Sequence, residues 1–222
     1  GMTLVLIEPT TNKTTTETTP IPTEKILVQV AAMEIEDLIE IDKLIELEGY
    51  RSRPYVLPPE KFPRSGITLG WGVDLGQWDE KEVRLILSKY FPPERYEKVF
   101  NAIRPFLGKK GEEARMLIFQ AHKALTPREV FELSVAFAHF FLDRIARLIP
   151  NFHRLPKNVR TVIFSIAWHR GLSVVQSKRG FGRVIQALRE ERIKDAKKIL
   201  ADLAKLDARF TKRYNKTALF LG

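Results

Sequence analysis

The chain has 222 residues, 44% of them hydrophobic, and a formal net charge of +10. Its length fits one domain with an appendage, or two small domains. It contains no cysteine, which excludes disulfide bonds and thiolate metal sites. No apolar run approaches the roughly 20 residues of a membrane helix. The four histidines lack the spacing of a metal-binding pair. We therefore expect no membrane span, no metal and no cofactor.

The positive charge is concentrated towards the end of the chain. Residues 151–222 carry 17 basic and 5 acidic side chains, whereas residues 1–50 carry 3 basic and 10 acidic side chains. A strongly cationic region favours an anionic partner, such as nucleic acid, a membrane surface or an acidic polymer. A solvated helical surface rich in Lys and Arg is the alternative interpretation.

We predict an N-terminal arm over residues 1–33, ahead of a folded domain over residues 34–222. Residues 9–24, PTTNKTTTETTPIPTE, are rich in Thr and Pro, a composition typical of a linker. The short apolar runs Leu4–Ile7 and Ile26–Val30 are candidate strands. The first residues lack the basic-then-apolar layout of a signal peptide, so we expect synthesis in the cytoplasm without a secretion signal.

A helix is predicted from about Ile35. Its apolar residues follow three- and four-residue spacing, ending at Leu44 and Ile45. Gly49 stands where a C-terminal helix cap is expected. Residues 51–78 are rich in Pro and Gly with β-prone residues between them, which predicts a small irregular β region.

After Gln77 the chain is predicted to be helical almost to its end. The helices are separated by Pro and Gly breaks, and Thr126 before Pro127 and Glu129 is typical of a helix start. The predicted fold class is therefore α+β and mainly α. It consists of an N-terminal helix and a small β subdomain, followed by a helical lobe.

The run ITLGWGVD, residues 67–74, is predicted to be one strand with two different faces. Ile67, Leu69, Trp71 and Val73 make the apolar face, and Trp71 is expected in the core. The other face carries Thr68, Gly70, Gly72 and Asp74. Glycine inside a strand often marks the close approach of a ligand or another backbone. This face therefore predicts the floor of a cleft.

Glu48 is a candidate general acid. It follows Leu44 and Ile45 on the apolar face of the predicted helix, and it lies in the last turn, where the helix dipole disfavours a negative charge. Burial and the dipole both raise the pKa of a carboxyl group. A carboxylic acid that stays protonated near neutral pH suits general acid catalysis. A solvated glutamate at a helix end is the alternative.

Glycosidic bond cleavage typically uses two carboxyl groups across the scissile bond. Glu48 and Asp74 are the pair that the predicted elements suggest, one at a helix end and one on an open strand face. Thr68, on the same face as Asp74, is placed to position a water molecule. A polar edge strand with turn glycines is the alternative interpretation of Thr68 and Asp74.

The pattern E-G-x-R, a polar loop and T-x-G-x-G resembles the phage-type (T4-like) lysozymes. Three later segments also resemble that superfamily: VIFSIAWHRGLS (162–173), RVIQALREERIKDAKKIL (183–200) and RFTKRYNKTALF (209–220). The similarity covers roughly residues 35–222. Residues 49–67 contain no aspartate, and Asp74 instead follows Thr68. That order is similar to the pesticin-like muramidases.

The resemblance implies a lysozyme-like fold and hydrolysis of the β-1,4 bond between N-acetylmuramic acid and N-acetylglucosamine. The implied catalytic set is Glu48 as acid, Asp74 as base and Thr68 holding the attacking water. Such an inverting reaction places the two carboxyl groups roughly 6.5–9.5 Å apart. The candidate substrate-binding residues are Tyr50, Tyr55, Gly70, Gly72 and His169, and His169 stands where the family often has asparagine.

Peptidoglycan is the expected partner, because its stem peptides and attached polymers are acidic. We expect a monomer that acts on the bacterial cell wall and binds no nucleic acid. Two alternatives remain open: a lytic transglycosylase or chitinase, and a non-catalytic module that presents its basic lobe to nucleic acid. The delivery route to the wall and the bacterial target stay open as well.

Overall fold

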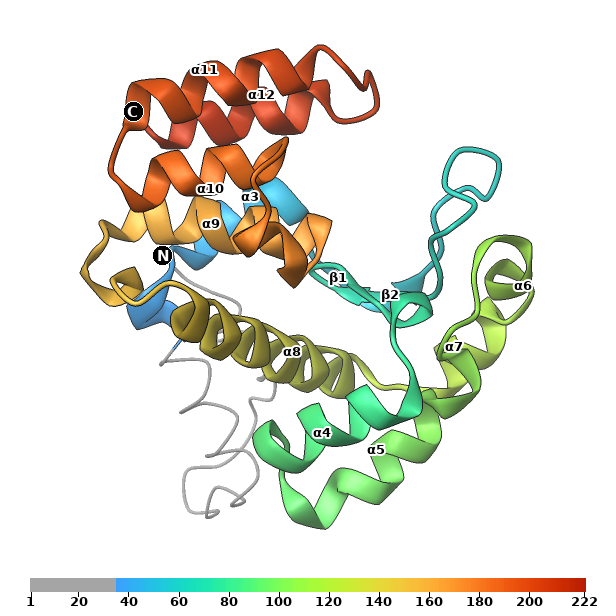
Figure 1. The fold of residues 1–222 in the computed structure, drawn as a ribbon. Helices are drawn as coiled ribbons and strands as arrows, with labels where there is room; N and C mark the ends of the chain where they lie inside the picture. Colours follow the sequence, from blue (N-terminus) through green and yellow to red (C-terminus); the bar gives the residue numbers. More distant parts are fainter. Residues whose placement is uncertain (1–34) are drawn as a thin grey trace. The chain divides into compact units, whose positions relative to one another are not determined.

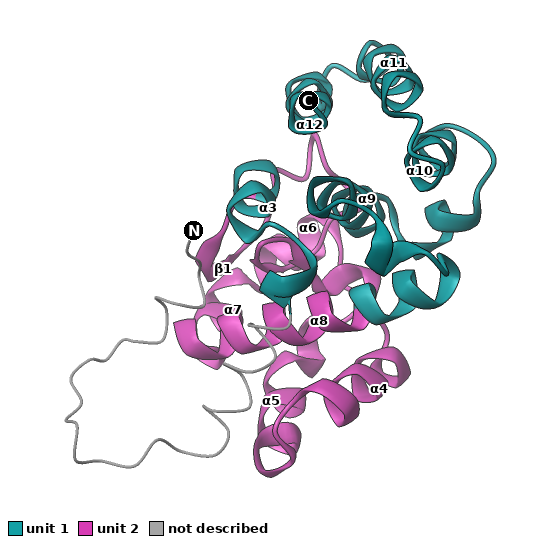
Figure 2. Cartoon of the chain, turned by 90° about the vertical axis from the view of Figure 1, so that its left-hand side faces the viewer, with its two compact units in different colours: residues 1, 34–48, 141–222 teal, residues 2–33, 49–140 magenta. Residues whose placement is uncertain are grey.

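The computed structural model describes residues 35–222 (Figure 1). The predicted arm over residues 1–33, its two candidate strands and the boundary at residue 34 lie outside the described residues. The fold is α+β and mainly α, with one small antiparallel sheet, as predicted. The chain forms two compact units (Figure 2). Unit 1 comprises residues 35–48 and Phe141–Gly222, and unit 2 comprises Gly49–Phe140.

Unit 1 is helical and is built around α9. Its helices are α3 (Ile41–Glu48), the end of α8 (Pro127–Leu148), α9 (Lys157–Arg170), α10 (Phe181–Arg189), α11 (Ile193–Ala204) and α12 (Thr211–Phe220), with the short 3-10 turns η5 (Phe152–Arg154) and η6 (Leu172–Gln176). Helix α9 packs against α3, α10 and α12. Helices α10, α11 and α12 follow one another side by side (Figures 1 and 2). The middle of α9 is buried, so it forms the core of this unit.

The predicted helix from Ile35 is interrupted before α3. Residues 35–38 are helical, the chain bends at residues 39–40, and α3 begins at Ile41. The backbone N–H of Glu40 donates to Thr161 Oγ1 at 2.8 Å, and Arg160 Nε donates to the carbonyl of Leu38 at 2.6 Å. Side chains of α9 therefore satisfy the backbone groups that the bend leaves free, and they fix the start of α3.

Unit 2 holds the sheet. Its strands are β1 (Arg51–Tyr55), β2 (Thr68–Gly70) and β3 (Val73–Asp74), paired antiparallel in the order β1-β2-β3. Its helices are α4 (Glu80–Tyr90), α5 (Tyr96–Ile103), α6 (Gly111–Met116), α7 (Ile118–Ala124) and the first part of α8, with the 3-10 turns η2 (Leu75–Gln77), η3 (Pro93–Arg95) and η4 (Arg104–Phe106). Helices α4 and α5 lie side by side (Figure 1).

The prediction of a single strand over residues 67–74 is wrong, because this run forms the β2–β3 hairpin. Gly72 N–H donates to the carbonyl of Leu69 at 3.0 Å and closes the turn. Gly70 has φ +58° and Gly72 has φ +119°, and glycine adopts such angles without a steric penalty. The two glycines therefore reverse the chain. The predicted apolar residues are confirmed as buried: Ile67 0%, Leu69 0%, Trp71 1% and Val73 2% exposed.

The predicted start of α8 is confirmed. Thr126 Oγ1 accepts a hydrogen bond from the N–H of Glu129 at 3.1 Å, and the Glu129 carboxylate accepts one from the N–H of Thr126 at 2.9 Å. This reciprocal pair is a capping box. None of the helices within residues 35–222 is long and apolar enough to cross a bilayer.

A buried ion pair follows this cap. Arg95 contacts the carboxylate of Glu132, whose side chain is 1% exposed, and lies 3.7 Å from Glu129. Burial raises the pKa of Glu132, and the hydrogen bond and positive charge of Arg95 oppose that rise. Arg95 therefore offsets part of the cost of burying the Glu132 carboxylate.

We expect Arg95→Met to lower the free energy of unfolding by about 3 kcal/mol at neutral pH, because it leaves Glu132 buried without its main cation. A pKa raised in the folded state gives stability that is present at low pH and lost as the pH rises. The defect should therefore be larger at pH 7.5 than at pH 5 in urea denaturation. Arg104→Met is the control, because the Arg104–Glu80 pair is exposed and should contribute less than about 1 kcal/mol.

Candidate functional site

Glu48 is the last residue of α3, and its side chain is only 6% exposed. Its Oε2 accepts a hydrogen bond from Ser165 Oγ of α9 at 2.9 Å and one from Arg213 of α12. Gly49 follows with φ +73°, the left-handed conformation expected of a helix cap. The predicted burial of Glu48 is therefore confirmed, and the solvated alternative is excluded.

Burial raises the pKa of Glu48 above its usual value. The positive charge of Arg213 and the hydrogen bonds from Arg213 and Ser165 act in the opposite direction. Burial is the largest of these effects, so the predicted rise is confirmed. Burial therefore favours the protonated form of the carboxyl group, whereas Arg213 and Ser165 favour the carboxylate.

Arg213 connects α12 to the end of α3. Its Nη1 donates to the carbonyl of Leu47 at 3.2 Å, while its Nη2 binds Glu48 and lies 3.3 Å from Ser165 Oγ. One guanidinium group therefore satisfies a free carbonyl at the helix end and fixes the adjacent acid. The side chain of Arg213 is 17% exposed.

Neither Ser165 nor Arg213 was expected at the site from the sequence. The sequence could have indicated Ser165, because it is the single hydroxyl within the apolar run Val162–Ala167. A polar group buried in such a run needs a hydrogen-bond partner. Nothing in the sequence distinguishes Arg213 from the other basic residues of the segment 209–216.

His169 belongs to the surroundings of Arg213. Burial lowers the pKa of His169 to about 3, and the charges of Arg213 and Arg170 act in the same direction. The imidazole is therefore neutral at physiological pH. Its ring packs against Phe210 with centroids 4.8 Å apart, and Nδ1 lies 3.5 Å from the hydroxyl of Tyr214. A contact between His169 and substrate stays a prediction.

The carboxylate of Asp74 is held by four hydrogen bonds within unit 2. Oδ1 accepts from the backbone N–H groups of Gly66 and Gly76, both at 2.9 Å. Oδ2 accepts from Ser65 Oγ at 3.1 Å and from Gln77 Nε2 at 3.2 Å. Asp74 thus caps η2 and joins the loop before β2 to the loop after β3.

Thr68 lies directly opposite Asp74 in the β2–β3 ladder. Residues opposite each other in an antiparallel pair present their side chains on one face. The side chain of Thr68 is buried, and its hydroxyl donates to the carbonyl of Gly66 at 3.0 Å. The structure therefore brings Thr68 and Asp74 together as predicted, through strand pairing and through Gly66.

The other predicted binding residues of unit 2 are close to the core. A Cβ on Gly70 would lie 1.8 Å from Ser134 Oγ and 3.1 Å from the ring of Tyr50. The space beside Gly70 is therefore filled by Ser134 of α8 and by Tyr50, and Gly70 does not form an open cleft floor as predicted. Tyr50 also packs against Trp71, with ring centroids 6.0 Å apart.

Tyr55 and Gly72 are more open than Gly70. The guanidinium of Arg51 lies over the ring of Tyr55, 4.3 Å from its centroid, and both Tyr55 and Gly72 are half-buried. Contacts of Tyr55 and Gly72 with substrate stay predictions.

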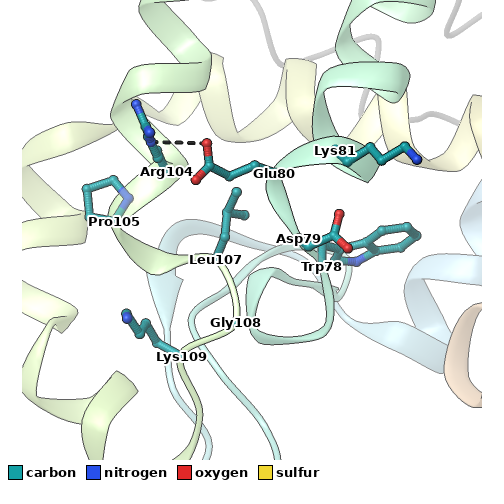
Figure 3. A pocket seen from close by; sticks show the side chains of 9 residues that line it. All are labelled: Trp78, Asp79, Glu80, Lys81, Arg104, Pro105, Leu107, Gly108 and Lys109. Carbon is teal, nitrogen blue, oxygen red and sulfur yellow. Dashed lines mark ion pairs between the residues drawn. The ribbon is translucent and has the colours of Figure 1, made fainter.

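One hollow of unit 2 is lined by none of the predicted residues. It measures about 750 Å³ and is lined by Trp78, Asp79, Glu80, Lys81, Arg104, Pro105, Leu107, Gly108 and Lys109 (Figure 3). Arg104 and Glu80 form an ion pair of 3.2 Å at one edge of the hollow (Figure 3). Within residues 35–222, no group of three or more His, Asp or Glu side chains is arranged to hold a metal ion.

Comparison with known proteins gives one family. No curated protein matches the chain. The profile of the Pesticin family, described as "bacterial toxin homologue of phage lysozyme, C-term", matches residues 38–188. The match includes Glu48, Thr68 and Asp74 and ends before α12. Because it covers more than half of the sequence, the chain belongs to the Pesticin family of phage lysozyme homologues.

Proposed function

We propose that the protein is an N-acetylmuramidase, which hydrolyses the β-1,4 bond between N-acetylmuramic acid and N-acetylglucosamine in peptidoglycan. Membership of a family of lysozyme homologues supports this class of reaction. The observation that carries the proposal is the environment of Glu48, a buried carboxyl group with a raised pKa and a cation on one of its oxygens.

Glu48 is the proposed general acid, which gives its proton to the oxygen of the leaving sugar. The raised pKa keeps that proton on the carboxyl group as substrate binds. When the proton leaves, Arg213 and Ser165 stabilise the carboxylate that forms. Arg213 is a positioning residue in this scheme, because it acts through Glu48.

Asp74 is the proposed base, and Thr68 holds the attacking water. The hydroxyl of Thr68 donates its hydrogen bond to the carbonyl of Gly66. The oxygen of Thr68 can therefore accept a hydrogen bond from the water. Asp74, as the base, takes the second proton of the water. A water held in this way presents its lone pair to the anomeric carbon. Inversion then requires the carboxyl groups of Glu48 and Asp74 to lie roughly 6.5–9.5 Å apart in the complex with substrate.

The proposed substrate agrees with the charge of the chain. Residues 151–222, with 17 basic and only 5 acidic side chains, belong to unit 1 together with Glu48. Peptidoglycan stem peptides and attached polymers are acidic, so these cations favour association with the wall. The proposed site of action is therefore the bacterial cell wall.

Glu48→Gln should abolish hydrolysis of purified peptidoglycan, with a loss of at least about 10³-fold, because the amide has no acidic proton to give. The assay is release of soluble fragments from cell walls. Glu46→Gln is the matched control, since Glu46 is exposed on the same helix and should keep full activity. A Glu48→Gln protein that lyses walls as fast as the wild type contradicts the proposal.

Arg213→Met should move the basic limb of the pH–rate profile to higher pH. The acid is active when protonated, and Arg213 holds the pKa of Glu48 lower than burial alone would. Removing this cation therefore extends protonation upwards in pH, while kcat falls because the carboxylate loses its partner. Arg209→Met is the control, because Arg209 pairs with Asp207 at the surface. An unmoved basic limb in Arg213→Met shows that Glu48 does not set it.

The products distinguish hydrolysis from the neighbouring reaction. A muramidase that uses water releases reducing N-acetylmuramic acid ends, and inversion yields the α-anomer first. Mass spectrometry and NMR of fresh digests measure both properties. Ends carrying 1,6-anhydro-muramic acid would show a lytic transglycosylase and overturn the role given to Asp74.

A further inference from the structure

The two oxygens of Asp74 are held by different kinds of donor. Oδ1 is bound by two backbone N–H groups, whereas Oδ2 is bound by the side chains of Ser65 and Gln77. A carboxylate offers about four lone-pair sites, so all of them are occupied. A water that approaches Asp74 to lose a proton must therefore take the place of one donor.

The backbone donors to Oδ1 are unable to move aside. A Cβ on Gly66 would lie 2.3 Å from the carbonyl oxygen of Lys109 and 2.7 Å from the Cα of Gly76. A Cβ on Gly76 would lie 2.6 Å from the same carbonyl oxygen. Three chain segments thus meet with no room between them. Oδ1 is an anchored oxygen, and Oδ2 is the oxygen that water can reach.

Of the two side chains on Oδ2, Gln77 is the one that can give way. Gln77 is exposed, and its Nε2 also donates to the carbonyl of Arg64 at 2.7 Å, which is shorter than its 3.2 Å bond to Asp74. The amide therefore keeps its stronger bond when the weaker one is replaced. The hydroxyl of Ser65 has one proton to donate, and it is directed at Asp74.

Building on the proposed function, we infer that Ser65 is a positioning residue that fixes Oδ2 of Asp74, and that the amide of Gln77 occupies the place that the attacking water takes. As the water oxygen bonds to the anomeric carbon, its O–H bond breaks and the proton passes to Oδ2. The bond from the anomeric carbon to the leaving oxygen breaks, and that oxygen takes the proton of Glu48.

Two variants that each remove one donor from the same oxygen should act in opposite directions. Ser65→Ala should lower kcat about tenfold, because Oδ2 loses the bond that orients it. Gln77→Ala should raise kcat about two- to fivefold, because the water no longer displaces an amide. KM should stay unchanged in both variants. The substrate is soluble, uncrosslinked peptidoglycan glycan, and kcat and KM are measured separately.

Controls separate positioning from loss of stability. Ser65→Thr keeps the hydroxyl and should restore kcat. Ser88→Ala and Gln120→Ala remove the same side-chain types from exposed positions of unit 2 and should have no effect. Thermal unfolding of each variant is followed in parallel. A kcat that falls in both Ser65→Ala and Gln77→Ala, in step with lower melting temperatures, overturns the inference and leaves the bonds a structural role.

Glu48→Gln in the same assay separates this inference from the proposed function. A wild type that releases no reducing ends overturns the function itself. An active wild type with an inactive Glu48→Gln, together with changes of the same sign in Ser65→Ala and Gln77→Ala, overturns only the roles given to Ser65 and Gln77.

Discussion

The burial of one carboxyl group, that of Glu48, is the constraint on which the functional interpretation depends. A buried acid is costly unless polar groups satisfy it, and here α9 supplies Ser165 and α12 supplies Arg213. Both helices pack against α3. The helical packing of unit 1 therefore keeps Glu48 at the end of α3 in an environment where burial, the largest effect, raises its pKa.

The position of the Asp74 carboxylate depends instead on backbone segments that pack closely together. Gly66 and Gly76 lie so near to each other and to Lys109 that any larger residue would clash with backbone atoms. That contact delivers two N–H groups to one oxygen of Asp74 and leaves the other oxygen to side chains. The carbonyl of Gly66 also accepts a hydrogen bond from the hydroxyl of Thr68. Gly66 therefore orients Thr68 through its carbonyl and Asp74 through its N–H.

The family match and the structure cover different parts of the acid's environment. The match over residues 38–188 includes Glu48 and Ser165. Arg213 lies beyond it, on α12, although its guanidinium binds Glu48 and the carbonyl of Leu47. Arg213, the cation that binds Glu48, is therefore identified by a contact in the tertiary structure and not by sequence similarity to the family.

The sequence by itself determined the α+β class and the burial of Glu48. These follow from local periodicity, from helix-capping residues and from short motifs, which depend on neighbours in the chain. The sequence did not show that Gly70 and Gly72 reverse the chain: this face was predicted to be the floor of a cleft, whereas both glycines have positive φ angles and Ser134 packs against Gly70. Thr68 and Asp74 share a face because they lie opposite each other in the hairpin, and not because they alternate along one strand. Only the tertiary structure decided which cation of the basic segment reaches Glu48 and which donors hold Asp74. The contact between Arg213 and Glu48 joins residues 165 positions apart, which no local pattern records. The donors to Asp74 lie within nine positions of it, but the folded loops that pack against Lys109 bring them to its carboxylate.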